Sequence, residues 1–125
     1  MKANALIKTG VLIGTAQALG CTPAAIQSVL PSGATVNFAY DLDAGSQFIV
    51  PSGDLGYPKN VVGLPALCAV SVQVASVGNS SYGLGIFLPE NWNGRFQAVG
   101  NGGFAGGINW LDMVCLNFQL LSFSS

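Results

Sequence analysis

The middle of the chain alternates apolar and polar residues with the period of a β-strand. Residues 68–77 alternate in this way, and residues 82–88 alternate again after a short polar interruption. The interruption at 78–81 reads Gly-Asn-Ser-Ser, and these residue types favour turns. We therefore predict an antiparallel hairpin whose second strand places four large residues on one face: Tyr82, Leu84, Ile86 and Leu88.

Two earlier segments carry weaker strand patterns. Residues 35–40 alternate so that three side chains fall on one face: Val36, Phe38 and Tyr40. A short apolar run at 48–50 predicts a second, shorter strand. Residues 51–60 combine Pro, Gly, Ser, Asn and Asp, which is typical of a loop.

The hairpin leads into the most distinctive stretch of the chain. Pro89 ends the return strand, a polar turn follows at 90–94, and residues 95–99 predict a third antiparallel strand. Five glycines then occur between residues 100 and 107. A strand that runs into such a loop leaves backbone N–H groups free to bind an anion or a developing oxyanion. A tight turn alone would also explain the glycines, and their spacing does not separate the two interpretations.

A short helix is predicted near the start of the chain. Thr22 suits the N-cap position, and Pro23 suits the first helical position. Small and apolar residues follow, and Pro31 ends the helix. We expect this helix to have a packing role.

The length of the chain leaves room for one domain, and its composition is apolar. Of its 125 residues, 50% are hydrophobic and only 7% are charged, with a net charge of −1. This balance offers no basic surface for nucleic acid or for an acidic membrane. It also excludes intrinsic disorder, and it predicts poor solubility because few charges cover a short apolar chain.

Residues 1–18 have the pattern of a secretory signal peptide. Lys2 and Lys8 form a basic start, an apolar segment begins at residue 11, and Ala-Gln-Ala at 16–18 fits the small-x-small cleavage pattern. The apolar segment is too short to span a bilayer. A buried N-terminal helix and a lipoprotein attached at Cys21 are the alternatives. The signal-peptide interpretation predicts a secreted, extracellular chain.

Two polar features add candidate sites. The Asn-Ser-Ser sequence at 79–81 is an N-glycosylation sequon with Asn79 as the acceptor. Asp41 and Asp43 are two carboxylates two residues apart, but no histidine or third acidic residue lies near them in sequence. We therefore prefer a solvated turn to a metal site and predict no bound metal.

A longer stretch resembles a known family. Residues 92–96 read WNGRF and residues 99–110 read VGNGGFAGGINW. They resemble the fungal tannase and feruloyl esterase family of secreted serine esterases, and the resemblance covers residues 19–113. It implies that the full-length parent is a carboxylic ester hydrolase acting on phenolic-acid esters. It also implies an α/β fold, the N-terminal portion of an α/β-hydrolase, here incomplete and built mainly of antiparallel strands plus one short helix.

The resemblance assigns roles to four residues. Gly102 or Gly103 would supply a backbone N–H group to the oxyanion hole. Cys21 would form a disulfide with Cys68, which stands in a Leu-Pro-x-x-Cys-Ala-Val segment of the family type. Closing that loop would stabilise the fold by about 4 kcal/mol in the chain-entropy model. Cys115 is then the odd cysteine of three.

The catalytic residues of the family are missing from this sequence. The family nucleophile stands in a Gly-Cys-Ser-x-Gly turn, and no Gly-x-Ser-x-Gly occurs here. The chain has no histidine, so none of its serines has the usual base. The family calcium site lies in a lid that is also missing, so we expect no cofactor. We predict an inactive fragment with no catalytic residue.

Residues 114–125 depart from the family pattern. They show no turn chemistry and no clear periodicity, and they begin Val-Cys. A fungal intron that starts GTATGT reads as Val-Cys in frame. We interpret this segment as translated intron, which would also account for Cys115, and we expect the family segment to end at Met113.

Two other functions are compatible with the sequence. A small secreted interaction or effector protein without enzymatic activity would fit the signal peptide, the size and the Cys21–Cys68 bridge, but it does not need the glycine-rich run. A ligand-binding remnant would use Trp92 and Trp110 as platforms, although both are better interpreted as packing residues. Arg95 is interpreted as a structural residue rather than as a contact to a substrate carboxylate.

Overall fold

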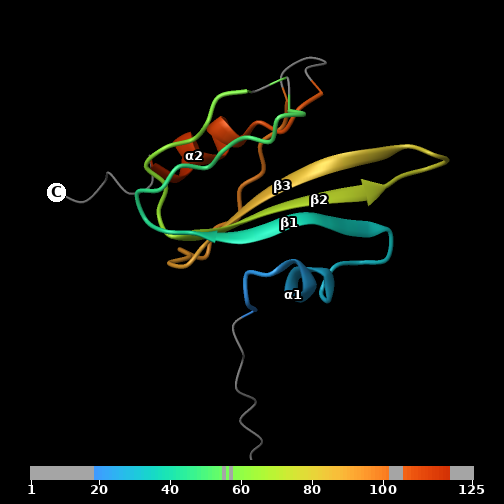
Figure 1. The fold of residues 1–125 in the computed structure, drawn as a ribbon, viewed down its shortest axis with the longest axis horizontal. Helices are drawn as coiled ribbons and strands as arrows, with labels where there is room; N and C mark the ends of the chain where they lie inside the picture. The colour runs from blue at the N-terminus through green and yellow to red at the C-terminus, as the bar shows by residue number, and fades with distance from the viewer. Residues whose placement is uncertain (1–18, 55, 57, 102–105, 119–125) are drawn as a thin grey trace, which may run out of the picture.

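Five secondary-structure elements make up the described part of the chain (Figure 1). The structure is a computed structural model, and it describes residues 19–54, 56, 58–101 and 106–118. In chain order the elements are helix α1 (Pro23–Gln27), strands β1 (Ala34–Leu42), β2 (Leu67–Ala75) and β3 (Ser81–Pro89), and helix α2 (Trp110–Phe118). Neither of these described helices has the length and hydropathy needed to cross a membrane. The predicted signal peptide at 1–18 lies outside the described residues.

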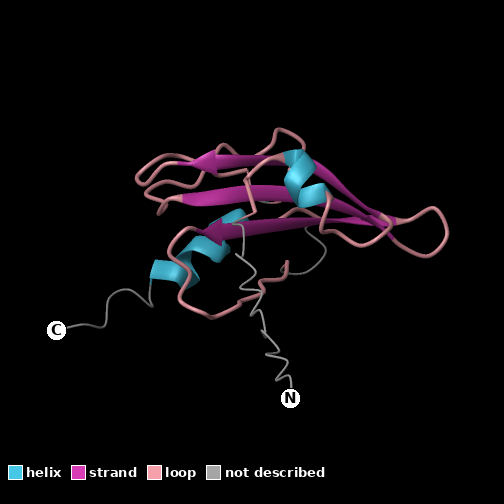
Figure 2. Ribbon diagram, turned by 90° about the horizontal axis from the view of Figure 1, so that it is seen from below, coloured by secondary structure: helices cyan, strands magenta, loops and turns pink. Residues whose placement is uncertain are grey.

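The three strands form one antiparallel sheet in the order β1-β2-β3. Helix α1 lies on one face of this sheet, and helix α2 lies on the other face with the long connection between β1 and β2 (Figures 1 and 2). The predicted hairpin is confirmed, because Val70 of β2 pairs with Ile86 of β3. The prediction of mainly antiparallel strands is also confirmed, but the sequence did not predict α2.

A bulge in β1 changes which side chains share a face. Val36 pairs with Val72 and Phe38 pairs with Ser71, so Asn37 is the extra residue. Since side chains alternate along a strand, the extra residue leaves Val36 on the α1 face and Phe38 on the α2 face. The prediction that these two residues share a face is wrong. The Asn37 amide donates a hydrogen bond to the buried Ser71 hydroxyl (3.2 Å).

Residues 95–99 do not form the predicted third strand. They follow a turn in which the Trp92 indole N–H donates to the Arg95 carbonyl oxygen (2.8 Å), and Phe96 is 87% exposed. They do not pair through backbone hydrogen bonds with any strand of the described sheet. A short apolar run is not enough for a strand, because the ladder needs a neighbour. The third strand of the sheet is β1.

The predicted short strand at 48–50 is reduced to a single bridge. Phe48 and Val61 exchange both backbone hydrogen bonds (2.8 and 3.0 Å). The Val50 N–H donates to the Asn60 side chain instead (3.0 Å). Pro51 follows directly and has no N–H group to extend the ladder. The connection between β1 and β2 is therefore held partly by side chains.

Helix α1 begins where the sequence predicts and ends earlier. The Thr22 hydroxyl oxygen accepts a hydrogen bond from the Ala25 N–H (3.2 Å), as expected for an N-cap. The helix stops at Gln27, well before Pro31. The Gln27 amide then pairs with the free edge of β1. Its Nε2 donates to the carbonyl oxygen of residue 34 and its Oε1 accepts from the N–H of residue 36, both at 2.9 Å. This pairing covers part of an edge that would otherwise be open.

The smaller core lies between α1 and the sheet. The predicted disulfide between Cys21 and Cys68 is present, with Cα atoms 5.7 Å apart, and it ties the start of α1 to β2. Ile26 is the buried residue of α1. It packs with apolar side chains of β1 and β2: Ala34, Ala39, Cys68, Val70 and Val72.

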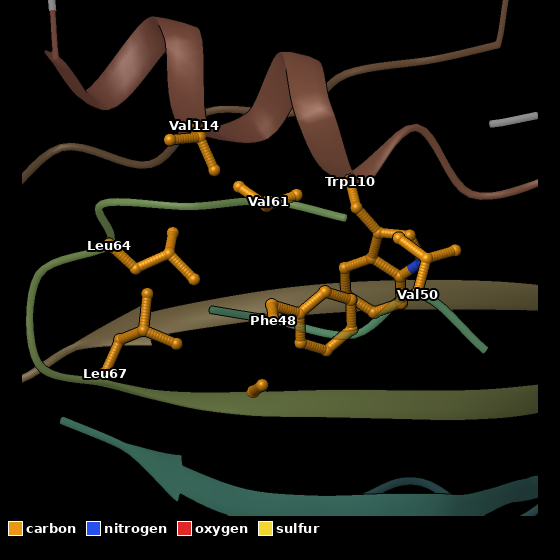
Figure 3. Packing of buried hydrophobic residues seen from close by; sticks show 8 residues of the cluster. Phe48, Val50, Val61, Leu64, Leu67, Trp110 and Val114 are labelled. Atoms are coloured by element: carbon orange, nitrogen blue, oxygen red, sulfur yellow. The ribbon is translucent and has the colours of Figure 1, made fainter. Parts of the chain in front are cut away.

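The larger core lies between the sheet and α2 (Figure 3). Trp110 and Phe48 are fully buried, and their ring centroids lie 4.6 Å apart. Their buried neighbours come from the β1–β2 connection, from β2 and from α2: Val50, Val61, Leu64, Leu67, Ala69 and Val114. Because Val114 belongs to this core, α2 packs across the predicted boundary after Met113. The intron origin of the tail stays a prediction, and residues 119–125 lie outside the described residues.

Trp110 reaches its buried position because glycine stands opposite it in β3. A Cβ atom at Gly85 would lie 2.5 Å from Trp110 Cη2 and 2.7 Å from Ile108 Cγ2, closer than side chains approach. On the same face, a Cβ atom at Gly83 would lie 3.6 Å from Ile108 Cδ1, which is an ordinary contact. The packing therefore requires glycine at 85 and only tolerates it at 83.

Replacing both Cys21 and Cys68 by alanine should lower the free energy of unfolding by about 4 kcal/mol, because the loop they close is then unconstrained in the unfolded chain. Urea denaturation of the variant and the wild type measures this difference. Reduced wild-type protein is the control and should match the double variant. A wild-type unfolding curve that a reductant does not shift would contradict the stabilising role.

The Gly85→Ala variant should lose about 1–3 kcal/mol of stability, because the new methyl group overpacks the Trp110 site. The matched Gly83→Ala variant carries the same change on the same face and should stay within about 0.5 kcal/mol of the wild type. Chemical denaturation followed by tryptophan fluorescence compares the two. Equal losses in both variants would show that strand propensity, not the Trp110 contact, decides the effect.

Candidate functional site

Both described ends of the glycine-rich loop lie beside β3. Residues 99–101 enter the loop and residues 107–109 leave it, and both segments line one groove. The oxyanion-hole candidates Gly102 and Gly103 fall between these ends and lie outside the described residues. The candidate site is therefore built from the groove and from the residues that hold the exit end of the loop at Ile108.

The groove has a volume of about 190 Å³. One wall is the β3 segment 83–85, and the others are the two loop ends with Met113 of α2. Two of the three residues in the β3 wall are glycine, so much of this wall is main chain. A ligand in the groove could approach the backbone closely, which is the usual reason for glycine at a binding surface.

Asp54 holds the end of the glycine-rich loop. Its Oδ2 atom accepts hydrogen bonds from the Ile108 backbone N–H (3.0 Å) and from the Trp110 indole N–H (3.2 Å). Its Oδ1 atom is buried and has no hydrogen-bond partner in the described part of the chain. One carboxylate thus joins the β1–β2 connection, the loop end and the core tryptophan.

Two glycines allow the loop to come this close to Asp54. Gly106 has a φ angle of +74°, in the left-handed region that glycine adopts without strain. At Gly107 any Cβ atom would collide with Asp54 Oδ1. The tight-turn interpretation, which the sequence left open, therefore explains Gly106, and the close approach of Asp54 explains Gly107. The oxyanion interpretation concerns Gly102 and Gly103 alone.

Helix α2 begins with a reciprocal side-chain cap. The Asp112 N–H donates to Asn109 Oδ1 (3.2 Å), and Asn109 Nδ2 donates to Asp112 Oδ2 (2.7 Å). Such a cap satisfies groups of the first turn that have no partner within the helix. The Asn-x-x-Asp spacing was visible in the sequence and could have predicted α2. No sequence signal joins Asp54 to Ile108, because 54 positions separate them.

The groove offers hydrogen bonds and apolar contacts but no catalytic group of its own. Its described walls contain no serine, cysteine, lysine or histidine. Lys59 is exposed in the β1–β2 connection. Ester hydrolysis through an acyl-enzyme needs a nucleophile and a general base. The arrangement can therefore bind a ligand, and the chemistry needs groups from outside this surface.

Of the two tryptophans, only Trp110 is a packing residue. Its complete burial prevents it from serving as a platform for a ligand. Trp92 is 65% exposed, and its indole closes the turn before residue 95. The Arg95 side chain is exposed, and its backbone N–H donates to Asn93 Oδ1 in the same turn (3.0 Å). Arg95 thus has a local structural role through its backbone.

One cluster in the described part of the chain has the composition of a metal site: Cys21, Asp41 and Cys68. The two sulfur atoms are bonded to each other, so neither is a thiolate that could bind a metal. Asp43 is exposed, and its carbonyl oxygen accepts a hydrogen bond from the Ser46 hydroxyl (2.6 Å). The predicted solvated turn is therefore confirmed at Asp43, but the prediction is wrong for Asp41, which belongs to β1 and pairs with Cys68.

Known proteins similar to this chain share one activity in their names. The chain is 35% identical to probable feruloyl esterase B-2 of Aspergillus flavus, over 83% of this chain and 21% of that protein. It is 37% identical to feruloyl esterase C of Talaromyces stipitatus, over 63% of this chain and 15% of that protein. It is 33% identical to probable feruloyl esterase B-2 of Aspergillus oryzae, over 74% of this chain and 18% of that protein. No family model matches the chain, and no solved structure matches it significantly.

These similarities cover most of this chain and a small part of each relative. The chain spans about a fifth of the length of the curated relatives it matches, between 15% and 21% for these three. They confirm the resemblance that the glycine-rich run indicates in the sequence. The chain is therefore related to the feruloyl esterases, a group of carboxylic ester hydrolases.

Proposed function

We propose that this chain is part of a secreted carboxylic ester hydrolase that acts on esters of phenolic acids. The observation that carries the proposal is the groove beside β3, bounded by both ends of a glycine-rich loop. The names of the similar proteins support the same activity. On this proposal the chain supplies a binding surface and a scaffold, and other parts of the protein supply the catalytic groups.

The glycine-rich loop would stabilise the oxyanion of the reaction. Hydrolysis of an ester through an acyl-enzyme passes through tetrahedral intermediates in which one oxygen carries negative charge. Backbone N–H groups bind such an oxygen, and glycine lets the substrate approach them. We assign this role to Gly102 or Gly103, between the two described ends of the loop. Their position after an early strand is the position of an oxyanion donor in α/β-hydrolases.

Asp54 would keep this loop in its working position. It bonds the backbone of Ile108 just after the loop and the side chain of Trp110 in the core. The end of the loop therefore cannot move without disturbing the packing around Trp110. Donors that are held in advance stabilise developing charge without reorganising during the reaction. Asp54 is a positioning residue on this proposal, because its contacts are with the protein.

A longer polypeptide would supply the rest of the enzyme. The sequence contains no histidine and no Gly-x-Ser-x-Gly, so the nucleophile and the base must come from elsewhere. On the α1 side, β3 also exposes a stripe of apolar side chains: Tyr82, Leu84 and Leu88. In an α/β-hydrolase fold, further elements would cover this stripe. Such a stripe on a lone edge strand invites aggregation.

A small secreted interaction protein without enzymatic activity is the second candidate. The exposed stripe on β3 favours it, because contiguous apolar surface also marks sites for partner proteins. This candidate gives no reason for a glycine-rich loop held at its end by a half-buried carboxylate. For that reason we place the ester hydrolase first.

Long-read sequencing of the transcript across the codon for Met113 should find a message that goes on to encode a Gly-x-Ser-x-Gly turn and a histidine. The protein from that message should hydrolyse methyl ferulate. The purified 125-residue chain should not exceed the buffer rate, because it has no general base. If every message encodes only the present 125 residues, the hydrolase proposal fails and the interaction protein takes its place.

Replacing Asp54 by alanine should lower the stability by about 2–4 kcal/mol, because the Ile108 backbone N–H and the Trp110 indole N–H lose their shared acceptor. Asp54→Asn should lower the stability by a smaller amount, since the oxygen of the side-chain amide can still accept a hydrogen bond. Asp43→Ala is the matched control at an exposed aspartate and should change stability by less than about 0.5 kcal/mol. Denaturation curves give the stability, and hydrogen exchange at the Trp110 indole reports the local bond. An indole that stays protected in Asp54→Ala would contradict the anchoring role.

A further inference from the structure

The turn between β2 and β3 forms the projecting tip of the sheet (Figure 1). It carries the one Asn-x-Ser/Thr sequence of the chain, residues 79–81. The turn is closed by the Ser76 N–H, which donates to the Ser80 carbonyl oxygen (2.9 Å). Gly78 makes the tight reversal with a φ angle of +71°. The sequon therefore stands at a place where the chain reverses in solvent.

The surroundings of Asn79 leave room for a large substituent. Asn79 is exposed, and its side-chain amide has no hydrogen-bond partner among the described residues. A Cβ atom built on Gly78 would have nothing within 4 Å. Val77 on the same turn is 92% exposed, so a group attached here displaces no packed side chain. Adding bulk at Asn79 thus costs no contact of the fold.

The third residue of the sequon is equally accessible. Ser81 is exposed at the first position of β3, and its hydroxyl oxygen accepts a hydrogen bond from Gln73 Nε2 (2.6 Å). The hydroxyl proton of Ser81 is not used in that bond. Ser80, one residue earlier, donates its own hydroxyl to the Val77 carbonyl oxygen (2.7 Å). The two serines therefore have separate roles, and each can be replaced without the other.

We propose that Asn79 is an N-linked glycosylation site and that this chain is modified there in the secretory pathway. The co-reactant is a lipid-linked oligosaccharide with a pyrophosphate leaving group. A bond forms between Asn79 Nδ2 and C1 of the first sugar, and the bond between that C1 and the carrier phosphate breaks. The amide loses one proton, and the carrier leaves with its electron pair. The modification adds a hydrophilic group at the hairpin tip, beside the exposed Val77.

Translation of the full chain with microsomal membranes tests the site. We expect one endoglycosidase-sensitive increase in mass on the protease-protected product, because the chain has one sequon. Asn79→Gln and Ser81→Ala should abolish the increase completely. Ser81→Thr should keep it, since threonine retains the hydroxyl group. Ser80→Ala is the matched control, because it removes a neighbouring hydroxyl and leaves the sequon intact.

Each result bears on the proposal. A mass increase that disappears in Asn79→Gln and Ser81→Ala and persists in Ser80→Ala supports it. A chain that is protected from protease but shows no increase in mass overturns the glycosylation site. A chain that the protease digests in the presence of the membranes overturns entry into the secretory pathway. An increase that survives Asn79→Gln assigns the sugar to another residue and also overturns it. None of these results depends on whether the longer protein hydrolyses esters.

Discussion

The contact between the Trp110 indole and Gly85 supports the whole α2 side of the molecule. The indole is fully buried and packs with Phe48, Phe38 and Phe87 at ring-centroid distances of 4.6, 6.2 and 5.3 Å. These rings come from β1, β3 and the connection before β2, so one side chain from α2 holds three segments together. Its N–H group bonds Asp54, which also holds the loop end. Without glycine at 85, the ring could not approach β3 this closely.

The α1 face of the sheet is held by a disulfide and a small apolar core, and it is only partly covered. The Cys21–Cys68 disulfide and Ile26 hold α1 over β1 and β2. Helix α1 is only five residues long, and the outward residues of β3 on this side remain exposed. β2 is therefore buried on both faces over most of its length, whereas β3 has no fully buried residue and is at most half-buried. This asymmetry agrees with a sheet that has further elements beside it.

The described part of this chain contains a binding groove but no catalytic group beside it. The described residues anchor the exit end of a glycine-rich loop and build a groove beside it, yet they offer no nucleophile or base there. An oxyanion-binding loop needs rigid support more than reactive side chains, because its donors are backbone groups. The half-buried carboxylate of Asp54 supplies such support at the exit end of the loop. The similarity to feruloyl esterases and the form of the groove therefore lead to the same proposed function.

The sequence by itself determined the local structure, and its family resemblance added one distant contact. Alternation predicted the β2–β3 hairpin, Thr22 and Pro23 predicted the start of α1, and the family resemblance predicted the Cys21–Cys68 bridge. The tertiary structure alone decided the bulge at Asn37, the lack of a strand at 95–99 and the bond between Asp54 and Ile108. Each of these depends on a partner far away in sequence: a register, a neighbouring strand or a buried donor. Periodicity and capping rules describe only neighbours along the chain, so they could not predict contacts that exist once distant segments are packed together.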